Sequence, residues 1–249
     1  MAGAALLGRL SWLAARVADV TIETPRVRTV HLDAPGWPGH RSGQHVDIRL
    51  TAEDGYQAQR SYSIANAADG ERVLLTVERV DDGEVSPFLV DELRPGDRFE
   101  LRGPIGGYFV WSPEDGGPLQ LVAGGSGVVP LMAMIRARAG SQIPTRLLYS
   151  ARAIDELIFL KELEALDADT GLEVTYTLTR ARPSGWEGFD RRVDRAMLEE
   201  VTWPADRAPL VFVCGPTGFV EMVATTLVSL GHPPERVRTE RFGPTGGSQ

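Results

Sequence analysis

The chain has 249 residues, 43% of them hydrophobic and 24% charged, which is enough for one large domain or two smaller ones, each with its own core. Its 26 basic and 34 acidic residues give a net charge of −8 without any long basic run, so the electrostatic footprint of a nucleic-acid binder is missing. Cys214 is the single cysteine and the four histidines lack ligand spacing, so an internal disulfide and cysteine-ligated zinc or iron–sulfur sites are excluded and no metal is expected.

The chain begins with a short apolar segment. Leu6, Leu10, Leu13 and Val17 have helical spacing, which predicts a small docking helix, and no cleavage site of a secretory signal follows. Residues 116–135 form the longest uncharged stretch, but glycines and prolines interrupt it, which is typical of a strand, a loop and a helix. We therefore expect a cytoplasmic protein without membrane contact.

Residues 14–112 are expected to form a domain rich in β-strands. Apolar runs separated by turn residues predict strands at 27–32, 45–50, 59–64, 73–80 and 98–101. A single helix is expected at 86–92, for which Ser86 is a good N-terminal cap. Several strands with one helix favour a small antiparallel barrel.

Residues 116–243 are expected to form a second domain, after a joint at 111–118 that is rich in glycine and proline. Strands and helices alternate in this part of the chain. Five alternating strands predict a doubly wound parallel sheet. The predicted strands are 119–123, 146–151, 173–178, 210–214 and 237–240, and the predicted helices are 130–139, 156–166, 194–201 and 218–230.

The first strand of the second domain runs into Gly124, Gly125, Ser126 and Gly127, called the glycine loop below, and Pro130 follows in the first turn of a helix. Glycines allow the backbone to approach a pyrophosphate closely, and a helix N-terminus offers free N–H groups to phosphate. The pattern departs from the usual dinucleotide fingerprint, and a tight turn of structural purpose is the alternative.

The next two strands end in hydroxyls and arginines. Ser150 and Arg152 end the second strand and Thr179 and Arg180 the third, with no carboxylate where NAD-binding folds hold the ribose. Because guanidinium groups bind phosphate, this favours NADP over NAD, with Arg180 carrying most of the preference. The alternative is that both arginines are solvated loop residues.

The fourth strand ends at the same carboxyl edge, where ligands bind in open α/β sheets. Cys214, Gly215, Pro216 and Thr217 follow one another there. A lone cysteine is usually an inert buried residue, but the sharp exit made by glycine and proline allows this thiol to face the crevice.

Two segments of the first domain carry polar groups that suit a ligand. Strand alternation puts Arg60 and Tyr62 on one face and Ser61 and Ser63 on the other. Residues 83–86 precede the predicted helix. They are either an ordinary cap or a second helix N-terminus that holds a second pyrophosphate.

Five motifs in order make the chain similar to the ferredoxin–NADP reductase superfamily of two-domain flavoprotein reductases, over about residues 16–242. The resemblance implies a six-stranded antiparallel FAD-binding barrel followed by a five-stranded parallel NADP-binding sheet. Relatives often carry Gly-x-Val after the tryptophan of the third loop, where this chain has Trp186 and then Arg191, Arg192 and Val193. The motifs are Arg60-x-Tyr62-Ser63, Gly83-x-x-Ser86, the glycine loop with Pro130, Cys214-Gly215-Pro216 and Glu240-Arg241-Phe242.

The resemblance also implies roles for individual residues. Tyr62 would stack on the flavin, and Ser63 would hydrogen-bond near the flavin N5 atom as a catalytic residue. Two further catalytic residues would be Cys214, beside the nicotinamide, and Glu240, which would close over the flavin. The FAD site would also include Arg60, Ser61, Thr76, Val77, Glu78, Gly83, Glu84, Val85, Ser86 and Phe242. The nicotinamide nucleotide would contact Gly125, Ser126, Gly127, Val128, Pro130, Ser150, Arg152, Thr179, Arg180, Cys214, Gly215, Pro216 and Thr217.

These expectations describe an NADPH-dependent flavoprotein reductase. NADPH would pass hydride to FAD, and the reduced flavin would release electrons singly to a separate acceptor protein. The chain has no cluster ligands of its own, so the acceptor is expected to be a ferredoxin, a flavodoxin or an oxygenase component. Two alternatives stay open: a reductase of free flavin or quinone, and a flavin-binding module without turnover.

Overall fold

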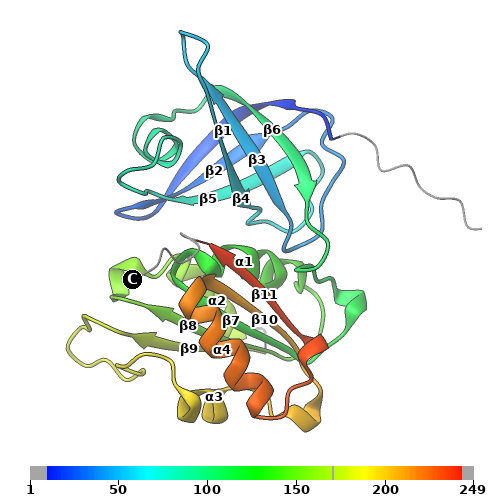
Figure 1. Ribbon diagram of the computed structural model, residues 1–249, viewed down its shortest axis with the longest axis vertical. Coiled ribbons are helices and arrows are strands. Elements are labelled where there is room, and N and C mark those ends of the chain that lie inside the picture. The colour runs from blue at the N-terminus through cyan, green and yellow to red at the C-terminus, as the bar shows by residue number, and fades with distance from the viewer. Residues whose placement is uncertain (1–9, 170, 243–249) are drawn as a thin grey trace, which may run out of the picture.

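The computed structural model describes residues 10–169 and 171–242, which form two stacked domains (Figure 1). The first contains an antiparallel sheet of six strands. The second contains a parallel sheet of five strands with helices on both faces. The predicted fold class, a barrel followed by a doubly wound sheet, is confirmed.

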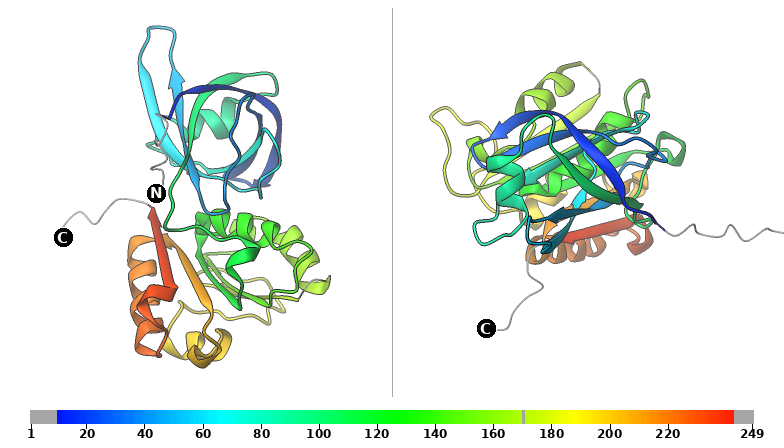
Figure 2. Two further views of the ribbon diagram at one scale, coloured as in Figure 1. Left: turned by 90° about the vertical axis from the view of Figure 1, so that its right-hand side faces the viewer. Right: turned by 90° about the horizontal axis from the view of Figure 1, so that it is seen from above.

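The six strands of the first domain curl into a barrel (Figure 2). Their order is β4-β3-β6-β1-β2-β5, and every neighbouring pair in this order runs antiparallel. Alternate side chains point inward, and Val46, Ile48, Leu75 and Leu101 are buried in the barrel core. The strands are β1 Leu13–Thr24, β2 Val27–Asp33, β3 His45–Thr51, β4 Gln57–Ser63, β5 Arg72–Glu78 and β6 Arg98–Ile105.

The prediction of an N-terminal helix is wrong for the part that the structure describes. Leu13 and Val17 lie in β1, which pairs with β2. Ala15 and Val17 are buried and the residues between and beside them are exposed, so burial has a period of two. Leu6 lies outside the described residues. Pairing with β2, which the leucine spacing does not reveal, decides the conformation of this segment.

The helix of the first domain lies where it was predicted, but its cap differs. Residues 86–92 are helical, and Phe88–Glu92 form a π-helix. The hydroxyl of Ser86 accepts a hydrogen bond from the backbone N–H of Val80 at 3.0 Å. Ser86 therefore closes the preceding loop, and its predicted role as a helix cap is wrong.

The second domain is built on a sheet with the order β11-β10-β7-β8-β9. Helices α1 and α2 cover the face nearer the barrel, and α3 and α4 cover the other (Figure 1). Within the described residues, no helix is long and apolar enough to cross a membrane. The strands are β7 Leu119–Gly124, β8 Thr145–Ala151, β9 Leu172–Leu178, β10 Leu210–Pro216 and β11 Val237–Phe242. The helices are α1 Val128–Ala137, α2 Leu160–Asp169, α3 Arg195–Val201 and α4 Thr217–Ser229. Short 3₁₀ turns lie at Pro113–Asp115, Gly125–Gly127, Ile154–Glu156, Ala205–Arg207 and Pro234–Arg236.

The second predicted helix of this domain begins only at Leu160. Before it, Leu157, Ile158 and Phe159 are all buried. The N–H of Ile158 donates to the hydroxyl of Tyr149 at 3.1 Å, and Phe159 has a φ of 60°, which a right-handed helix does not contain. A helix would turn one of three consecutive apolar side chains toward solvent, so burying all three requires an irregular turn.

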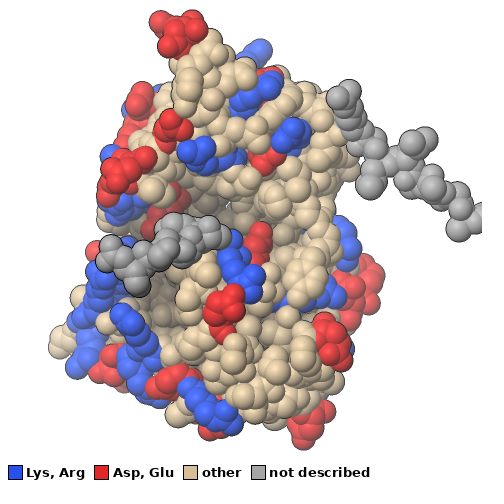
Figure 3. Space-filling view, viewed as in Figure 1, with Lys and Arg blue, Asp and Glu red and all other residues tan. Residues whose placement is uncertain are grey.

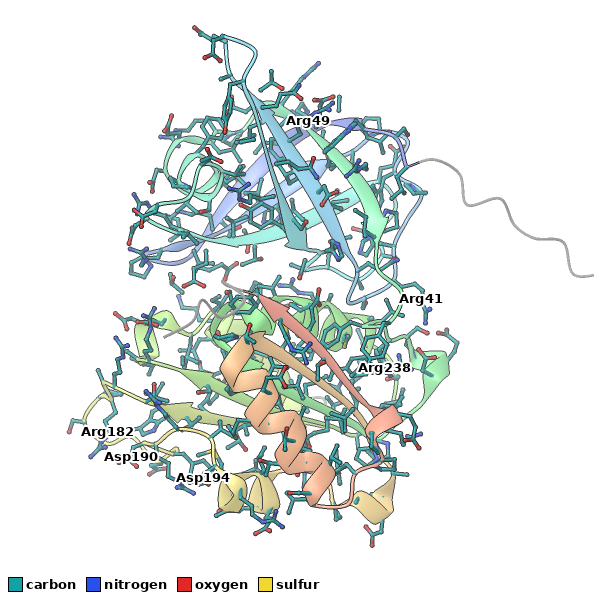
Figure 4. All side chains as sticks on the ribbon, viewed as in Figure 1. Arg41, Arg49, Arg182, Asp190, Asp194 and Arg238 are labelled. Carbon is teal, nitrogen blue, oxygen red and sulfur yellow. The ribbon has the colours of Figure 1, made fainter. Side chains whose placement is uncertain are left out.

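The two domains contact each other through side chains and through shared apolar packing. The Arg238 guanidinium on β11 donates to the carbonyl of Val110 at 2.7 Å (Figure 4). The hydroxyl of Ser42 donates to the carbonyl of Ala133 on α1 at 3.0 Å. Ala65 of the barrel domain is fully buried within the core of the α/β domain. These contacts hold α1 and the start of β11 against the barrel domain.

Candidate active site

A cavity of about 840 Å³ lies between the two domains, at the carboxyl edge of the parallel sheet. The space-filling view shows the surface hollowed between the two halves of the molecule (Figure 3). Both domains contribute to the wall, which is the place where open α/β sheets bind ligands. The barrel supplies Thr24, Pro25, Arg26, Val27 and Glu78, and the α/β domain supplies Gly124, Gly125, Ser126, Ser150, Ala151, Arg152, Asp155, Glu156, Ile158, Thr179, Arg192, Val193, Pro216, Gly218, Phe219, Met222 and Phe242.

The glycine loop connects β7 to α1 as the sequence predicts. Gly125 has a φ of 55°, and a Cβ placed there would have no neighbour within 4 Å, so its backbone faces open space in the cavity. A Cβ on Gly127 would lie 2.2 Å from the carbonyl oxygen of Cys214, so this glycine also allows α1 to approach β10. Val128 and Pro130 are buried in the first turn of α1. The loop therefore combines tight packing with an exposed backbone suited to phosphate.

The ends of β8 and β9, which each carry a hydroxyl residue and an arginine, differ in which of these residues line the cavity. Ser150, Arg152 and Thr179 line it, whereas Arg180 does not. The side chain of Arg152 is paired with Glu156, with a distance of 2.8 Å between Nε and Oε2. The backbone N–H of Arg180 donates to the carbonyl of Arg152 at 2.9 Å, so the two strand ends lie side by side.

The loop after β9 brings a further arginine that sequence reasoning did not select. Arg191 is paired with Asp194 at 2.8 Å, and Arg182 is paired with Asp190 (Figure 4). Arg192 lines the cavity, and its side chain makes no hydrogen bond or ion pair within residues 10–169 and 171–242. The sequence feature that could have indicated Arg192 is the departure after Trp186, where this chain has two arginines and a valine in place of the Gly-x-Val of its relatives. Arg192 is therefore a cation that faces the cavity without an acidic partner in the described structure.

Acidic and basic groups from both domains meet at the cavity wall. Glu78, at the end of β5, and Asp155, after β8, each line it. Arg26 also lines it, but its guanidinium is bonded to Asp81 at 3.1 Å and to the carbonyl of Arg79 at 2.9 Å. The turn at residues 24–27 carries no ligand motif, and only the packing of the domains brings it to the site.

Cys214 and Glu240 are neighbours in the register of β10 and β11. Cys214 is 2% exposed and does not line the cavity, so the prediction that its thiol faces the crevice is wrong. Burial raises the pKa of this thiol well above its usual value, with a smaller contribution from the carboxylate of Glu240. Burial also raises the pKa of Glu240 to about 7, and its Oε2 atom is buried without a hydrogen-bond partner in the described structure.

Arg60, the charged residue of the motif Arg60-x-Tyr62-Ser63 on β4, belongs to a network of hydrogen bonds at the surface. The guanidinium of Arg60 is 3.2 Å from the carboxylate of Glu84, and the hydroxyl of Tyr56 donates to the same carboxylate at 2.8 Å. Both partners of the ion pair are about half exposed, so it is open to exchange with another anion. This arrangement brings residues 83–86 next to β4, as a shared ligand would require.

The other residues of the motif have different surroundings. Ser61 donates to Asp47 at 2.7 Å, and the same carboxylate is paired with Arg102 at 2.6 Å, so Ser61 takes part in a structural network. Tyr62 is half-buried against the barrel core, and burial raises the pKa of its hydroxyl to about 12. Ser63 is the last residue of β4, at the end of the strand that points toward the domain junction (Figure 1).

On β5 and in the following loop, most predicted ligand side chains point inward. The Thr76 hydroxyl is hydrogen-bonded to that of Thr29 at 2.8 Å, and Val77 is fully buried in the barrel core. Val85 is also fully buried, and a Cβ on Gly83 would lie 2.9 Å from the hydroxyl oxygen of Ser86. The backbone groups of these residues are left for a ligand, and Glu78 lines the cavity.

Comparison with known proteins agrees with this arrangement. Residues 16–110 match the oxidoreductase FAD-binding domain family and residues 121–225 match the oxidoreductase NAD-binding domain family. Ferredoxin–NADP reductase B of Sorangium cellulosum is 36% identical over 210 residues, which cover 81% of this chain and 84% of that protein. The glycine betaine monooxygenase reductase subunit of Chromohalobacter salexigens is 31% identical over 239 residues, which cover 92% of this chain and 64% of that protein.

Solved structures share the fold. The FAD/NAD-binding domain of a nitric oxide dioxygenase from Vibrio cholerae superposes with a TM-score of 0.83 at 25% identity, covering 93% of this chain and 99% of that one. Two domains of this kind, with a glycine loop and a cavity at their junction, define a flavoprotein that uses a pyridine nucleotide. The chain belongs to the ferredoxin–NADP reductase superfamily, as its motifs predicted. It is an NAD(P)H-dependent oxidoreductase that contains FAD.

Proposed function

We propose that this enzyme takes electrons from NADPH through bound FAD and delivers them to a separate acceptor protein. The observation that carries the proposal is the cavity of about 840 Å³, whose wall joins the glycine loop and strand ends of one domain to Glu78 and residues 24–27 of the other. A site built by both domains allows two cofactors to meet. The proposed units are a FAD-binding domain, residues 14–112, and a pyridine-nucleotide-binding domain, residues 116–243.

The α/β domain fits a dinucleotide phosphate. Gly125 and Ser126 stand in the 3₁₀ turn that leads into α1, a helix of ten residues, and the positive end of the helix dipole favours an anion there. Thr179 and Arg192 line the same cavity, and a hydroxyl with a guanidinium that has no partner in the described part of the chain suits the 2′-phosphate that distinguishes NADPH from NADH. Arg180, beside Arg152, would add to the positive potential from outside the wall.

The barrel domain fits the flavin. Tyr62 offers an aromatic face and Ser63 a hydroxyl at the end of β4, while Arg60 and the backbone of residues 83–86 are positioned for a pyrophosphate. Binding of that pyrophosphate would displace Glu84 from Arg60. Bound FAD supplies the conversion of paired electrons into single ones, and the protein supplies its position and surroundings.

Glu240 is the register neighbour of Cys214 and is not among the residues that line the cavity, and we propose that it holds a proton next to the site. Burial raises its pKa to about 7, so near neutral pH the carboxyl is present in both forms. Its Oε2 atom, which has no hydrogen-bond partner among the described residues, would be available for a hydrogen bond to a bound group. The neighbouring Cys214 stays a neutral thiol, because burial raises its pKa, and would not act as a nucleophile.

The acceptor is proposed to be a ferredoxin, a flavodoxin or an oxygenase component. The name of one relative is ferredoxin–NADP reductase, and another is the reductase subunit of a monooxygenase, which supports a protein acceptor for this chain as well. The chain spans 64% of the second relative's length.

Three measurements test the proposal. Acid release of the cofactor followed by chromatography should yield FAD, because residues 83–86 have no role toward a flavin without the adenosine diphosphate arm. Under anaerobic conditions NADPH should bleach the visible flavin band faster than NADH does at the same low concentration. Steady-state assays with a ferredoxin, free flavin and a quinone then separate a protein reductase from the alternatives, and a flavin that no nicotinamide reduces would refute the proposal.

A further inference from the structure

Arg136 connects three separate parts of the molecule. It lies in the last turn of α1, the helix that begins directly after the glycine loop. Its Nε and Nη2 atoms donate to the two carboxylate oxygens of Glu162 on α2, at 2.9 and 2.6 Å. Its Nη1 atom donates to the backbone carbonyl of Ala65, in the barrel domain, at 2.7 Å. One guanidinium therefore bonds α1 and α2 to the other domain.

The surroundings of this contact keep it rigid. The guanidinium lies over the ring of Phe159, at 4.8 Å from its centre, and the side chain of Arg136 is 20% exposed. Phe159 itself is buried. The carboxylate of Glu162 neutralises the guanidinium charge through a bidentate ion pair, and the ring of Phe159 covers one side of the guanidinium plane. Among the described residues of the barrel domain, the hydrogen-bond partner of Arg136 is a single carbonyl oxygen, which is fixed by the backbone.

That carbonyl belongs to Ala65, which lies just beyond the end of β4. Ala65 follows Ser63 by two residues and is fully buried, and its own N–H donates to the carbonyl of Leu74 at 2.8 Å. A second contact lies one turn earlier on α1, where Ala133 accepts from the hydroxyl of Ser42 at 3.0 Å. Two contacts on the same face of α1 thus hold the helix against the barrel at the point where β4 ends.

We infer that Arg136 is a positioning residue for electron transfer between the two cofactors. By holding the end of β4 to α1, it sets the spacing between Ser63 and the glycine loop. The inference rests on the proposed function, in which Ser63 faces the flavin and the glycine loop holds the pyridine nucleotide. Arg136 touches neither cofactor in this arrangement and acts through the backbone of both elements. Reactions between two bound groups depend steeply on such spacing.

The chain contains a matched control for this contact. Arg146 has an Nε 2.8 Å from the carboxylate of Glu173, donates to the carbonyl of Thr202 at 3.3 Å, and lies 4.0 Å from the ring centre of Trp203. Its side chain is 26% exposed. Arg146 has the same three kinds of partner as Arg136, but all of them belong to the α/β domain. Removing it disturbs the fold of one domain without freeing the two domains from each other.

The experiment compares Arg136→Met, Arg136→Lys and Arg146→Met as FAD-loaded enzymes with the wild type. Rapid mixing with saturating NADPH gives the rate of flavin reduction, and equilibrium titration with oxidised NADP gives its Kd. We expect the saturated rate of Arg136→Met to fall about 10- to 100-fold with the Kd changed by less than about threefold. Lysine has one donor group in place of a planar fork, so Arg136→Lys should recover only part of the rate. Arg146→Met should lower the Tm and keep the wild-type rate.

Several outcomes overturn the inference. A wild-type reduction rate in Arg136→Met is one, and an equal loss of rate in Arg146→Met is another, because it would indicate general destabilisation. If Arg136→Met does not retain FAD, Glu162→Gln is the milder variant, and it must then show a smaller loss of rate in the same direction. A wild-type flavin that NADPH does not reduce would instead refute the proposed function, and the role of Arg136 with it.

Discussion

Replacing Glu240 by glutamine should change how the stability of the protein depends on pH. Burial raises the pKa of Glu240 in the folded chain to about 7, against 4.5 for an exposed glutamate. Below pH 4.5 the carboxyl is protonated in both the folded and the unfolded chain, so it adds no pH dependence to the unfolding free energy. Between pH 4.5 and 7 the folded chain keeps a proton that the unfolded chain has released, so stability falls as the pH rises. Above pH 7 this loss is complete.

The size of the effect follows from the two pKa values. A difference between about 7 and 4.5 corresponds to about 3 kcal/mol of unfolding free energy over the whole range. Measurements at pH 5 and pH 8 sample most of it, so the wild type should lose about 2 kcal/mol more than Glu240→Gln between these values. The glutamine keeps the volume of the side chain but does not titrate, so the variant should lack this component.

Urea unfolding of both proteins, in the same cofactor state, measures the difference. Glu221→Gln is the control, because Glu221 is exposed and paired with Arg241 at 2.7 Å, and it should behave as the wild type does. Unfolding free energies of the wild type and Glu240→Gln that run parallel from pH 5 to pH 8 would refute the reasoning. In that case water or a bound group would solvate the carboxylate in the folded protein.

Three other variants test the proposed site. Ser63→Ala should slow flavin reduction more than it weakens FAD binding, because the hydroxyl is proposed to act where charge moves, and stopped-flow reduction at the wild-type rate would exclude that role. Arg192→Ala should weaken NADPH binding about 10-fold or more and leave NADH nearly unchanged, with a smaller effect from Arg180→Ala, as titrations at two salt concentrations can measure. Gly127→Ala should lower the Tm and pyridine nucleotide binding together, since its Cβ would meet the Cys214 carbonyl at 2.2 Å, and an unchanged Tm would contradict the packing described here.

The sequence by itself determined the division into two domains and the class of each. Strand and helix periodicities are local properties, and the glycine loop, Pro130 and the Cys214-Gly215-Pro216 strand end are recognisable from consecutive residues. The order of the motifs was enough to predict the superfamily, FAD and a pyridine nucleotide. Each of these inferences depends on residues that are close in the chain, where spacing alone restricts the geometry.

Only the tertiary structure decided which side chains face the cavity. Arg191 is neutralised by Asp194, while the adjacent Arg192 has no acidic partner among residues 10–169 and 171–242, a difference that depends on the position of the loop after β9. Cys214 is buried because Gly127 lets α1 pack closely on β10, and residues 13–24 form a strand because β2 offers them a partner. Such outcomes depend on which distant segments meet, and a strand, a buried thiol or an unpaired guanidinium is stable only once its neighbours are in place.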